Sequence, residues 1–256
     1  MTRYTAPEEL RVFGVAGIPE IRPGDDLAAI ILKALREANK SLQSGDVVVA
    51  AQKIISKSEG RLITLSSVSP SSEAIDLGKK TEKDPRLVEL ILRESVSVVA
   101  HRPGVLIVEH KSGLVLANAG IDRSNVENGH GDETVLLLPE NPDRSAAALR
   151  DGLGVSVGVV INDSLGRAWR VGTIGTAIGV AGLSAIVDLN GNPDMQQRPL
   201  QATIIGMADE LAAAASIVMG QAAEARPVAI IRGLSGHLAD GAARDLMRPR
   251  ETDLFR

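Results

Sequence analysis

An uncharged, glycine-rich run at residues 171–187 constrains the fold of this chain more than any other segment. The run lies between Arg170 and Asp188 and carries glycines at positions 172, 175, 179 and 182. It is shorter than the roughly 20 apolar residues that a membrane-spanning helix needs. Glycines on all sides would also weaken a helix. We therefore expect a buried core segment of a soluble protein, with no membrane span.

The rest of the chain alternates short apolar runs with amphipathic stretches, which is typical of a mixed α/β protein. The spacing predicts a helix capped by Asp25 or Asp26 that ends near residue 42, and helices over residues 71–80, 84–94, 142–152 and 208–219. Strands are predicted over residues 47–51, 96–100, 105–110, 114–117, 155–161 and 228–231. We expect mixed sheets with flanking helices, arranged in two subdomains.

Composition excludes several function classes. The formal net charge is −4 and aromatic residues make up 2% of the chain, so a nucleic-acid partner is not expected. The absence of cysteine excludes disulfides, zinc–thiolate sites, iron–sulfur clusters and thiol nucleophiles. These features fit a cytoplasmic protein, and the polar residues 1–9 are not expected to form a signal peptide.

The length of 256 residues suits one large domain or two small ones. Turn-forming residues cluster at 129–133 and 139–142, which predicts a subdomain boundary near residues 130–145. We interpret residues 1–235 as a single domain and the polar residues 236–256 as a tail or linker.

Two aspartates, Asp122 and Asp163, each follow an apolar strand and precede a turn. Loops at strand ends are where α/β proteins collect ligand groups. Mg²⁺ beside a nucleotide takes one or two carboxylates together with phosphate oxygens, and Ser164 can add a hydroxyl oxygen. The positions are therefore compatible with metal binding, and helix caps or turn formers are the open alternative.

Two basic segments accompany these aspartates. Residues 52–61 follow a predicted strand and end in Gly60-Arg61, and the lysines of this segment, Lys53 and Lys57, can meet phosphates as point charges. Arg167 and Arg170 follow Asp163 and can bind a carboxylate or phosphate through two parallel hydrogen bonds. Solvated surface charge and ion pairing with surface acids remain the alternatives for both segments.

Several familiar signatures are missing from the sequence. The glycine-rich phosphate loop that ends in Gly-Lys-Ser or Gly-Lys-Thr is not present. Glycines 152, 154 and 158 lead into a predicted strand rather than out of one, so they do not form a dinucleotide-binding fingerprint. The four histidines are not at metal-ligand spacing, and no Gly-x-Ser-x-Gly motif occurs.

An ordered set of motifs, from about residue 12 to residue 235, resembles one family, the coenzyme F420-0:L-glutamate ligases, also called gamma-glutamyl ligases. Two runs carry most of this resemblance: Ile55-Ser56-Lys57-Ser58-Glu59-Gly60-Arg61 and Asn118-Ala119-Gly120-Ile121-Asp122. Asp163-Ser164-Leu165-Gly166-Arg167 and Ile230-Ile231-Arg232-Gly233-Leu234 follow in the family's order.

The resemblance implies a GTP-dependent ligase that adds L-glutamate to the terminal carboxylate of a deazaflavin precursor of coenzyme F420. GTP would phosphorylate that carboxylate, and the amine of glutamate would displace the phosphate. Such catalysis consists mostly of positioning and charge neutralisation, so it needs no reactive nucleophile from the protein. The family also implies an intertwined homodimer, and some relatives carry an additional nitroreductase-like domain.

By matching positions, the resemblance assigns roles to individual residues. Catalysis would rest on Asp122, Asp163 and Lys57. Two Mg²⁺ or Mn²⁺ ions per site would be held by Asp122, Asp163, Ser164 and Gln221, and K⁺ is a further candidate ion. GTP would contact Ile18, Pro19, Glu20, Ile21, Gln52, Lys53, Lys57, Asn125, Met219, Gly220 and Gln221.

This sequence departs from the family pattern around the second metal. Gln221 is neutral where a carboxylate can occur, Ala222-Ala223 replaces a glycine-rich stretch, and Ser164 stands where some relatives have threonine. Two other functions stay open: a ligase of the same fold that acts on a different carboxylate, and a non-catalytic protein that binds the deazaflavin or a nucleotide. The sequence does not decide how many glutamates are added or whether GTP is preferred.

Overall fold

The computed structural model describes residues 5–123, 133–234 and 238–254. Its centre is a mixed sheet with the strand order β1-β12-β2-β8-β9. The strands are β1 (Arg11–Val15), β12 (Val228–Arg232), β2 (Val47–Ala51), β8 (Gly158–Arg167) and β9 (Arg170–Ala181). Only β2 and β8 run parallel, and the other three neighbouring pairs are antiparallel. The predicted mixed α/β class is confirmed.

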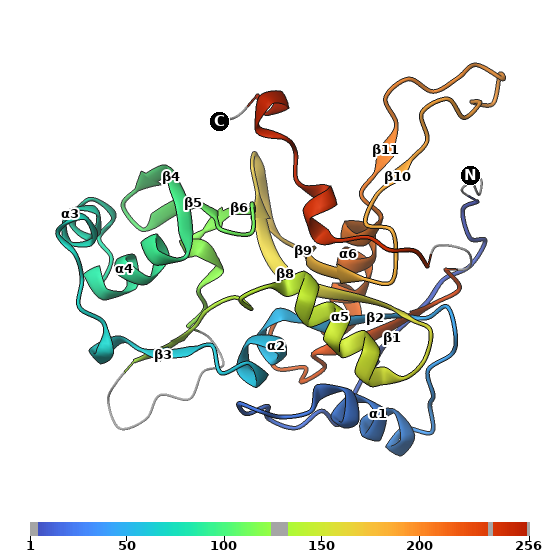
Figure 1. The fold of residues 1–256 in the computed structure, drawn as a ribbon, viewed down its shortest axis with the longest axis horizontal. Coiled ribbons are helices and arrows are strands. Elements are labelled where there is room, and N and C mark those ends of the chain that lie inside the picture. Colours follow the sequence, from blue (N-terminus) through green and yellow to red (C-terminus); the bar gives the residue numbers. More distant parts are fainter. Residues whose placement is uncertain (1–4, 124–132, 235–237, 255–256) are drawn as a thin grey trace.

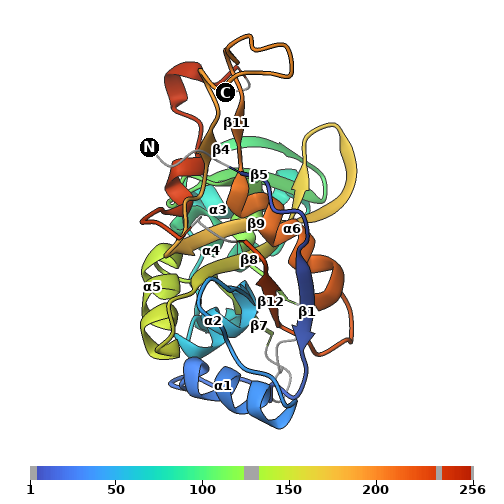
Figure 2. The same ribbon diagram turned by 90° about the vertical axis from the view of Figure 1, so that its right-hand side faces the viewer.

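Helices cover both faces of this sheet. Helices α1 (Leu27–Glu37) and α5 (Pro142–Leu153) pack on one face and α6 (Met207–Met219) packs on the other, as the side view of Figure 2 shows. The two faces of β2 explain why its sequence is apolar throughout. Val48 and Ala50 join the core under α1, whereas Val47 and Val49 join the core under α6, because successive strand residues point to opposite faces.

Three of the four glycines of residues 171–187 belong to strand β9 and not to a helix, and Gly182 follows the end of this strand. A β-carbon at Gly179 would lie 2.4 Å from the carbonyl oxygen of Pro142 in α5, and one at Gly175 would lie 2.4 Å from that of Ala212 in α6. These glycines therefore let a helix backbone approach β9 closely from each face. The expected burial holds only for the second half of the strand, because Val171 lies at its exposed end.

Two other predicted boundaries are wrong. Helix α1 begins after Asp26, whose carboxylate accepts from the N–H of Ala29, but it ends at Glu37 rather than near residue 42. Asn39 has a left-handed φ of 53°, which turns the chain out of the helix. Strand β8 begins at Gly158 and continues to Arg167, six residues beyond the predicted end at 161, because it pairs with β9 beyond the edge of the core.

A second group of elements packs around its own core beside the central sheet (Figure 1). It contains α3 (Ser72–Thr81), α4 (Pro85–Arg93) and a three-stranded sheet of β4 (Ser95–Arg102), β5 (Val105–His110) and β6 (Val115–Ala117). Strands β3 (Leu62–Thr64) and β7 (Thr134–Leu136) form an antiparallel pair that joins this group to the main sheet.

Two peripheral segments complete the described chain. Strands β10 (Val187–Asp188) and β11 (Ile204–Ile205) begin and end an arm that projects from the molecule in Figure 1. Near the C-terminus, Ala243 is buried and Leu238 and Leu246 pack against the core under α6. Within the described ranges, no helix has both the length and the apolar character needed to cross a membrane.

Candidate functional site

A cavity of about 420 Å³ opens where β2 ends and α2 (Gln52–Ser58) begins. Clefts of this size typically bind small molecules. Its wall combines four segments that are distant in the sequence: residues 18–21, the start of α2, the polar part of β8, and the end of α6 with the loop that follows it. Predicted site residues in this wall are Ile18, Pro19, Glu20, Ile21, Gln52, Lys53, Lys57, Asp163, Ser164, Met219, Gly220 and Gln221.

Helix α2 supplies the cations of the cavity. The strand β2 runs directly into it, so Lys53 and Lys57 lie one turn apart on the same helix. Lys57 is only 8% exposed, and its ammonium group forms an ion pair with Glu20, which also lines the cavity. Gln52 is buried, and its amide donates to Ser56 Oγ at 2.7 Å and to the Leu137 carbonyl at 3.4 Å. Gln52 therefore also holds α2 against the segment that follows β7 and contains Leu137.

Lys53 brings the two predicted metal-binding aspartates into one cluster. Its Nζ lies 2.8 Å from Asp122 Oδ2, and both side chains are partly buried. Burial raises the pKa of the Asp163 carboxyl, the N–H of Ser164 opposes this rise, the charge of Asp122 adds to it, and Lys53 opposes it more weakly. Two carboxylates that repel each other in a partly buried position form a site to which a cation is attracted.

Asp122 is held by an unusual backbone. Asn118 and Ala119 both have left-handed φ angles, 52° and 54°. Residues with side chains pay strain energy in this region, and such strain clusters at functional sites. After this turn, Asp122 exchanges two backbone hydrogen bonds with Leu136 of β7, at 3.0 and 2.9 Å. The carboxylate is thus fixed by the strand pair and not by the turn alone.

Asp163 lies inside β8 and not at the end of a strand, which corrects the sequence-based interpretation. Burial ends near Asn162 even though the strand continues, so the polar residues that follow stand at the edge of the core. Asn162 is 4% exposed and lines the cavity, and its Oδ1 has no hydrogen-bond partner among the described residues. The sequence did not identify Asn162 as a site residue, because a single asparagine after a strand is common in turns.

The oxygen donors of this cluster fit a hard divalent cation. Besides the two carboxylates, Ser164 Oγ donates to Gln221 Oε1 at 2.7 Å, which joins β8 to the loop after α6. Within the described ranges, no group of three or more histidine, cysteine, aspartate or glutamate side chains forms a complete metal cage. Mg²⁺ does not require one when phosphate oxygens and water complete its coordination.

Some predicted contacts are not part of this cavity. Arg167 and Arg170 lie at the exposed end of the β8–β9 hairpin and do not contribute to the wall. Asn125 lies outside the described residues, so its assignment to the nucleotide stays a prediction.

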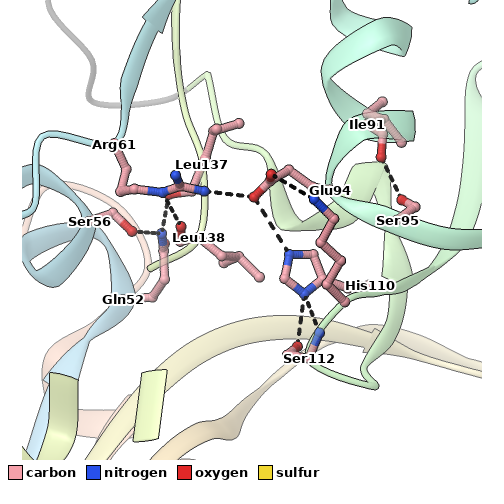
Figure 3. A network of polar contacts seen from close by, with 11 residues as sticks. Gln52, Ser56, Arg61, Ile91, Glu94, Ser95, His110, Ser112, Leu137 and Leu138 are labelled. Atoms are coloured by element: carbon pink, nitrogen blue, oxygen red, sulfur yellow. Dashed lines mark hydrogen bonds and ion pairs between the residues drawn. The ribbon is translucent and has the colours of Figure 1, made fainter. Parts of the chain in front are cut away.

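Arg61, the last residue of the motif that contains Lys57, does not line this cavity. Its Nε donates to the Leu138 carbonyl at 2.9 Å and its guanidinium pairs with Glu94 at 2.7 Å. Figure 3 shows His110 on the far side of Glu94, with Nε2 at 4.0 Å. Burial lowers the pKa of His110, while Glu94 opposes this effect. Arg61 therefore joins the second group of elements to the segment that carries Leu136 and holds Asp122.

We expect Arg61→Ala to lower the free energy of unfolding by about 2 to 4 kcal/mol, because it leaves the largely buried Glu94 without its closest cation. Lys79→Ala is the matched control, since its pair with Asp76 is exposed and should contribute less than about 0.5 kcal/mol. Urea unfolding of both variants measures the difference. Equal effects would show that the Arg61 network does not hold the two parts together.

Comparison with known proteins agrees with this architecture. The model of the F420-0:gamma-glutamyl ligase family matches residues 16–233. A coenzyme F420:L-glutamate ligase of Methanothermobacter thermautotrophicus is 46% identical over 96% of this chain and 99% of its own length. A protein of the same name from Methanopyrus kandleri is 44% identical over 96% of this chain and 98% of its own length.

A mixed α/β protein with a cationic and carboxylate-lined cavity thus matches a family of ligases over nearly its whole length. The chain belongs to the F420-0:gamma-glutamyl ligase family.

Proposed function

We propose that this ligase joins L-glutamate to the terminal carboxylate of the deazaflavin precursor of coenzyme F420 and uses GTP to activate that carboxylate. The observation that carries the proposal is the Lys53, Asp122 and Asp163 cluster beside a cavity that contains the buried Lys57. The relatives from Methanothermobacter and Methanopyrus carry the name coenzyme F420:L-glutamate ligase, which supports this substrate assignment.

The proposed reaction has two steps. A carboxylate oxygen of the acceptor attacks the γ-phosphorus of GTP, and the bond from that phosphorus to the β–γ bridging oxygen breaks, so GDP leaves. The amine of glutamate then attacks the acyl carbon of the mixed anhydride. The carbon–oxygen bond to phosphate breaks, phosphate leaves with one oxygen of the original carboxylate, and the new amide nitrogen loses a proton.

The residues of this chain can position and neutralise these groups. Lys57 and Lys53 lie where the phosphates of a nucleotide in the cavity would approach. Asp122, Asp163, Ser164 and Gln221 would hold two Mg²⁺ or Mn²⁺ ions, which would neutralise charge on the phosphates and on the attacking carboxylate. We also propose that the enzyme works as a homodimer, as the family resemblance implies, with K⁺ as an additional ion to test.

The acyl-phosphate step has a direct test. The acceptor carboxylate is labelled with heavy oxygen, and the released phosphate is analysed by mass spectrometry. Transfer of one labelled oxygen into each phosphate is the expected result. Unlabelled phosphate accompanied by glutamyl product would contradict the acyl-phosphate mechanism while leaving the ligase activity in place.

We expect Lys57→Ala to weaken GTP binding by about 10- to 100-fold, because it removes a largely buried cation from the cavity wall. Glu20→Gln is the opposing control: it removes the negative partner of Lys57, so GTP affinity should hold or increase. Calorimetric titration with GTP in the presence of Mn²⁺ measures both. An unchanged affinity in Lys57→Ala would show that the ammonium group does not face the phosphates.

A further inference from the structure

A second cavity of about 410 Å³ includes Ile178 of β9 in its wall. The turn between β5 and β6, the first turn of α5 and residues 242–247 enclose it. Asp143 is part of the wall, and one of its carboxylate oxygens accepts hydrogen bonds from the N–H groups of Val180 and Ala243, both at 2.8 Å. The C-terminal segment, drawn in red in Figure 1, is thereby tied to α5.

Three cationic side chains line this cavity: Lys111, Arg144 and Arg244. In the described part of the chain, the guanidinium groups of Arg144 and Arg244 form no hydrogen bond or ion pair. The Nζ of Lys111 is 3.9 Å from Glu94 Oε1, so this cation already has an acidic neighbour. The wall also contains two acids, Glu140 and Asp143, and Asp143 is already engaged by two backbone N–H groups. Three cations therefore face two acids, and two of the cations have no ion-pair partner among the described residues. The cavity therefore offers unpaired positive charge to an anionic ligand.

The position of the second cavity relates it to the proposed reaction centre. Its wall includes Ile178 of β9, and Thr176, two residues earlier on the same strand, lies opposite Asp163 of β8. Residues two apart in a strand share one face, and diagonal neighbours on adjacent strands lie about 7–8 Å apart. The pairing of β8 with β9 shifts register beside Ile178, but Ile178 shares one core with Ile161, which is two residues before Asp163 on β8. The second cavity therefore begins on the face of the sheet that carries Ile161.

The remainder of the wall is apolar, with Leu114, Ile178 and Met247. A ligand with both an anionic group and a larger apolar part suits this combination better than free glutamate, which is small and polar throughout. We propose that the second cavity binds the anionic part of the carboxylate acceptor, with Arg144 and Arg244 as its recognition residues. This assignment rests on the proposed ligase function.

The test compares Arg144→Ala, Arg244→Ala and the double variant with Arg248→Ala, an exposed arginine nearby that does not line the cavity. Rates are measured with the purified deazaflavin acceptor, glutamate, GTP and Mn²⁺. Each single variant should raise the KM for the acceptor by about 10-fold, as the loss of a charge-assisted hydrogen bond predicts. The KM for glutamate, GTP affinity and the melting temperature should stay at the wild-type values, and Arg248→Ala should match wild type.

The outcomes separate this assignment from the proposed function. Acceptor-dependent phosphate release by the wild-type enzyme would support the ligase function. If the double variant then showed the same acceptor KM as wild type, the assignment of the cavity would be overturned and the ligase function would stand. A raised KM for glutamate alone would also overturn it, by making the cavity the glutamate site. Arg244→Glu should weaken acceptor binding further than Arg244→Ala, and equal effects would show that charge is not recognised.

Discussion

Asp163→Asn is expected to lower turnover by about 100- to 1,000-fold while making the metal-free protein more stable. The loss of turnover follows from the removal of a charge that would stabilise the metals and the transferring phosphoryl group. The gain in stability follows from the raised pKa of Asp163, whose first cause is burial. Because burial disfavours the charged form, charging this carboxyl costs folding free energy that the asparagine does not incur.

The stability difference between Asp163→Asn and wild type depends on pH, because the pKa of Asp163 is raised in the folded state. The folded-state pKa of Asp163 lies above the ordinary value of an aspartate, so the destabilisation is fully present above the folded pKa. It disappears as the pH falls through the folded pKa towards the unfolded one. The stability advantage of Asp163→Asn over wild type should therefore be largest at neutral pH and shrink in acid. Urea unfolding in the presence of a chelator at several pH values measures this difference.

Asp209→Asn is the matched control for this prediction. Burial also raises the pKa of Asp209, but its carboxylate lies outside the cavity and accepts from the N–H of Ala177 at 2.9 Å. An asparagine oxygen can still accept that bond, so Asp209→Asn should retain turnover within a few-fold. Addition of Mn²⁺ should raise the melting temperature of wild type but not of Asp163→Asn. Normal turnover in Asp163→Asn would remove this carboxylate from the proposed metal site.

Gly175→Ala is expected to destabilise the fold by about 3 kcal/mol and to reduce activity with it. The new β-carbon would lie 2.4 Å from the Ala212 carbonyl oxygen and 2.8 Å from Asn162 Oδ1. Because the first neighbour is helix backbone, α6 must move away from β9, and overpacking of this kind typically costs 1–3 kcal/mol and occasionally more. The displacement also reaches Asn162, which lines the cavity at the start of α2.

Gly166→Ala gives a control on the same hairpin. A β-carbon at Gly166 meets nothing within 4 Å, so its effect should stay within about 0.5 kcal/mol. Unfolding midpoints of the two variants in urea measure the contrast directly. Equal stability of Gly175→Ala and Gly166→Ala would contradict the close approach of α6 to β9.

The parts of the fold that could be predicted are those with strong local signals. Helix α4 has Asp84 as its cap, Pro85 in its first turn and apolar residues at helical spacing, and strand β5 has sharp turns at both ends. The part of β8 that follows Asn162 could not be predicted as a strand. Its sequence from Asn162 onwards is polar and turn-like, and only pairing with β9 keeps it extended.

Part of the candidate site could also be predicted from the sequence, and part of it could not. The order of motifs pointed to Asp122, Asp163 and Lys57, and the structure places Asp163 and Lys57 in the wall of one cavity, with Asp122 joined to it through Lys53. The place of Arg61 in a structural network could not be predicted, because its partner Glu94 lies in another group of elements. The second cavity could not be predicted either, because its wall combines four segments that are far apart in the sequence.

The most direct test of the proposed function is phosphate release from GTP in the presence of Mn²⁺, glutamate and the purified deazaflavin acceptor, with the product mass measured in parallel. Asp163→Asn serves as the negative control. We predict release that requires both the acceptor and glutamate, together with an increase in acceptor mass by whole glutamate residues. Phosphate release that is indifferent to the acceptor, or an acceptor whose mass does not change, would contradict the proposed function.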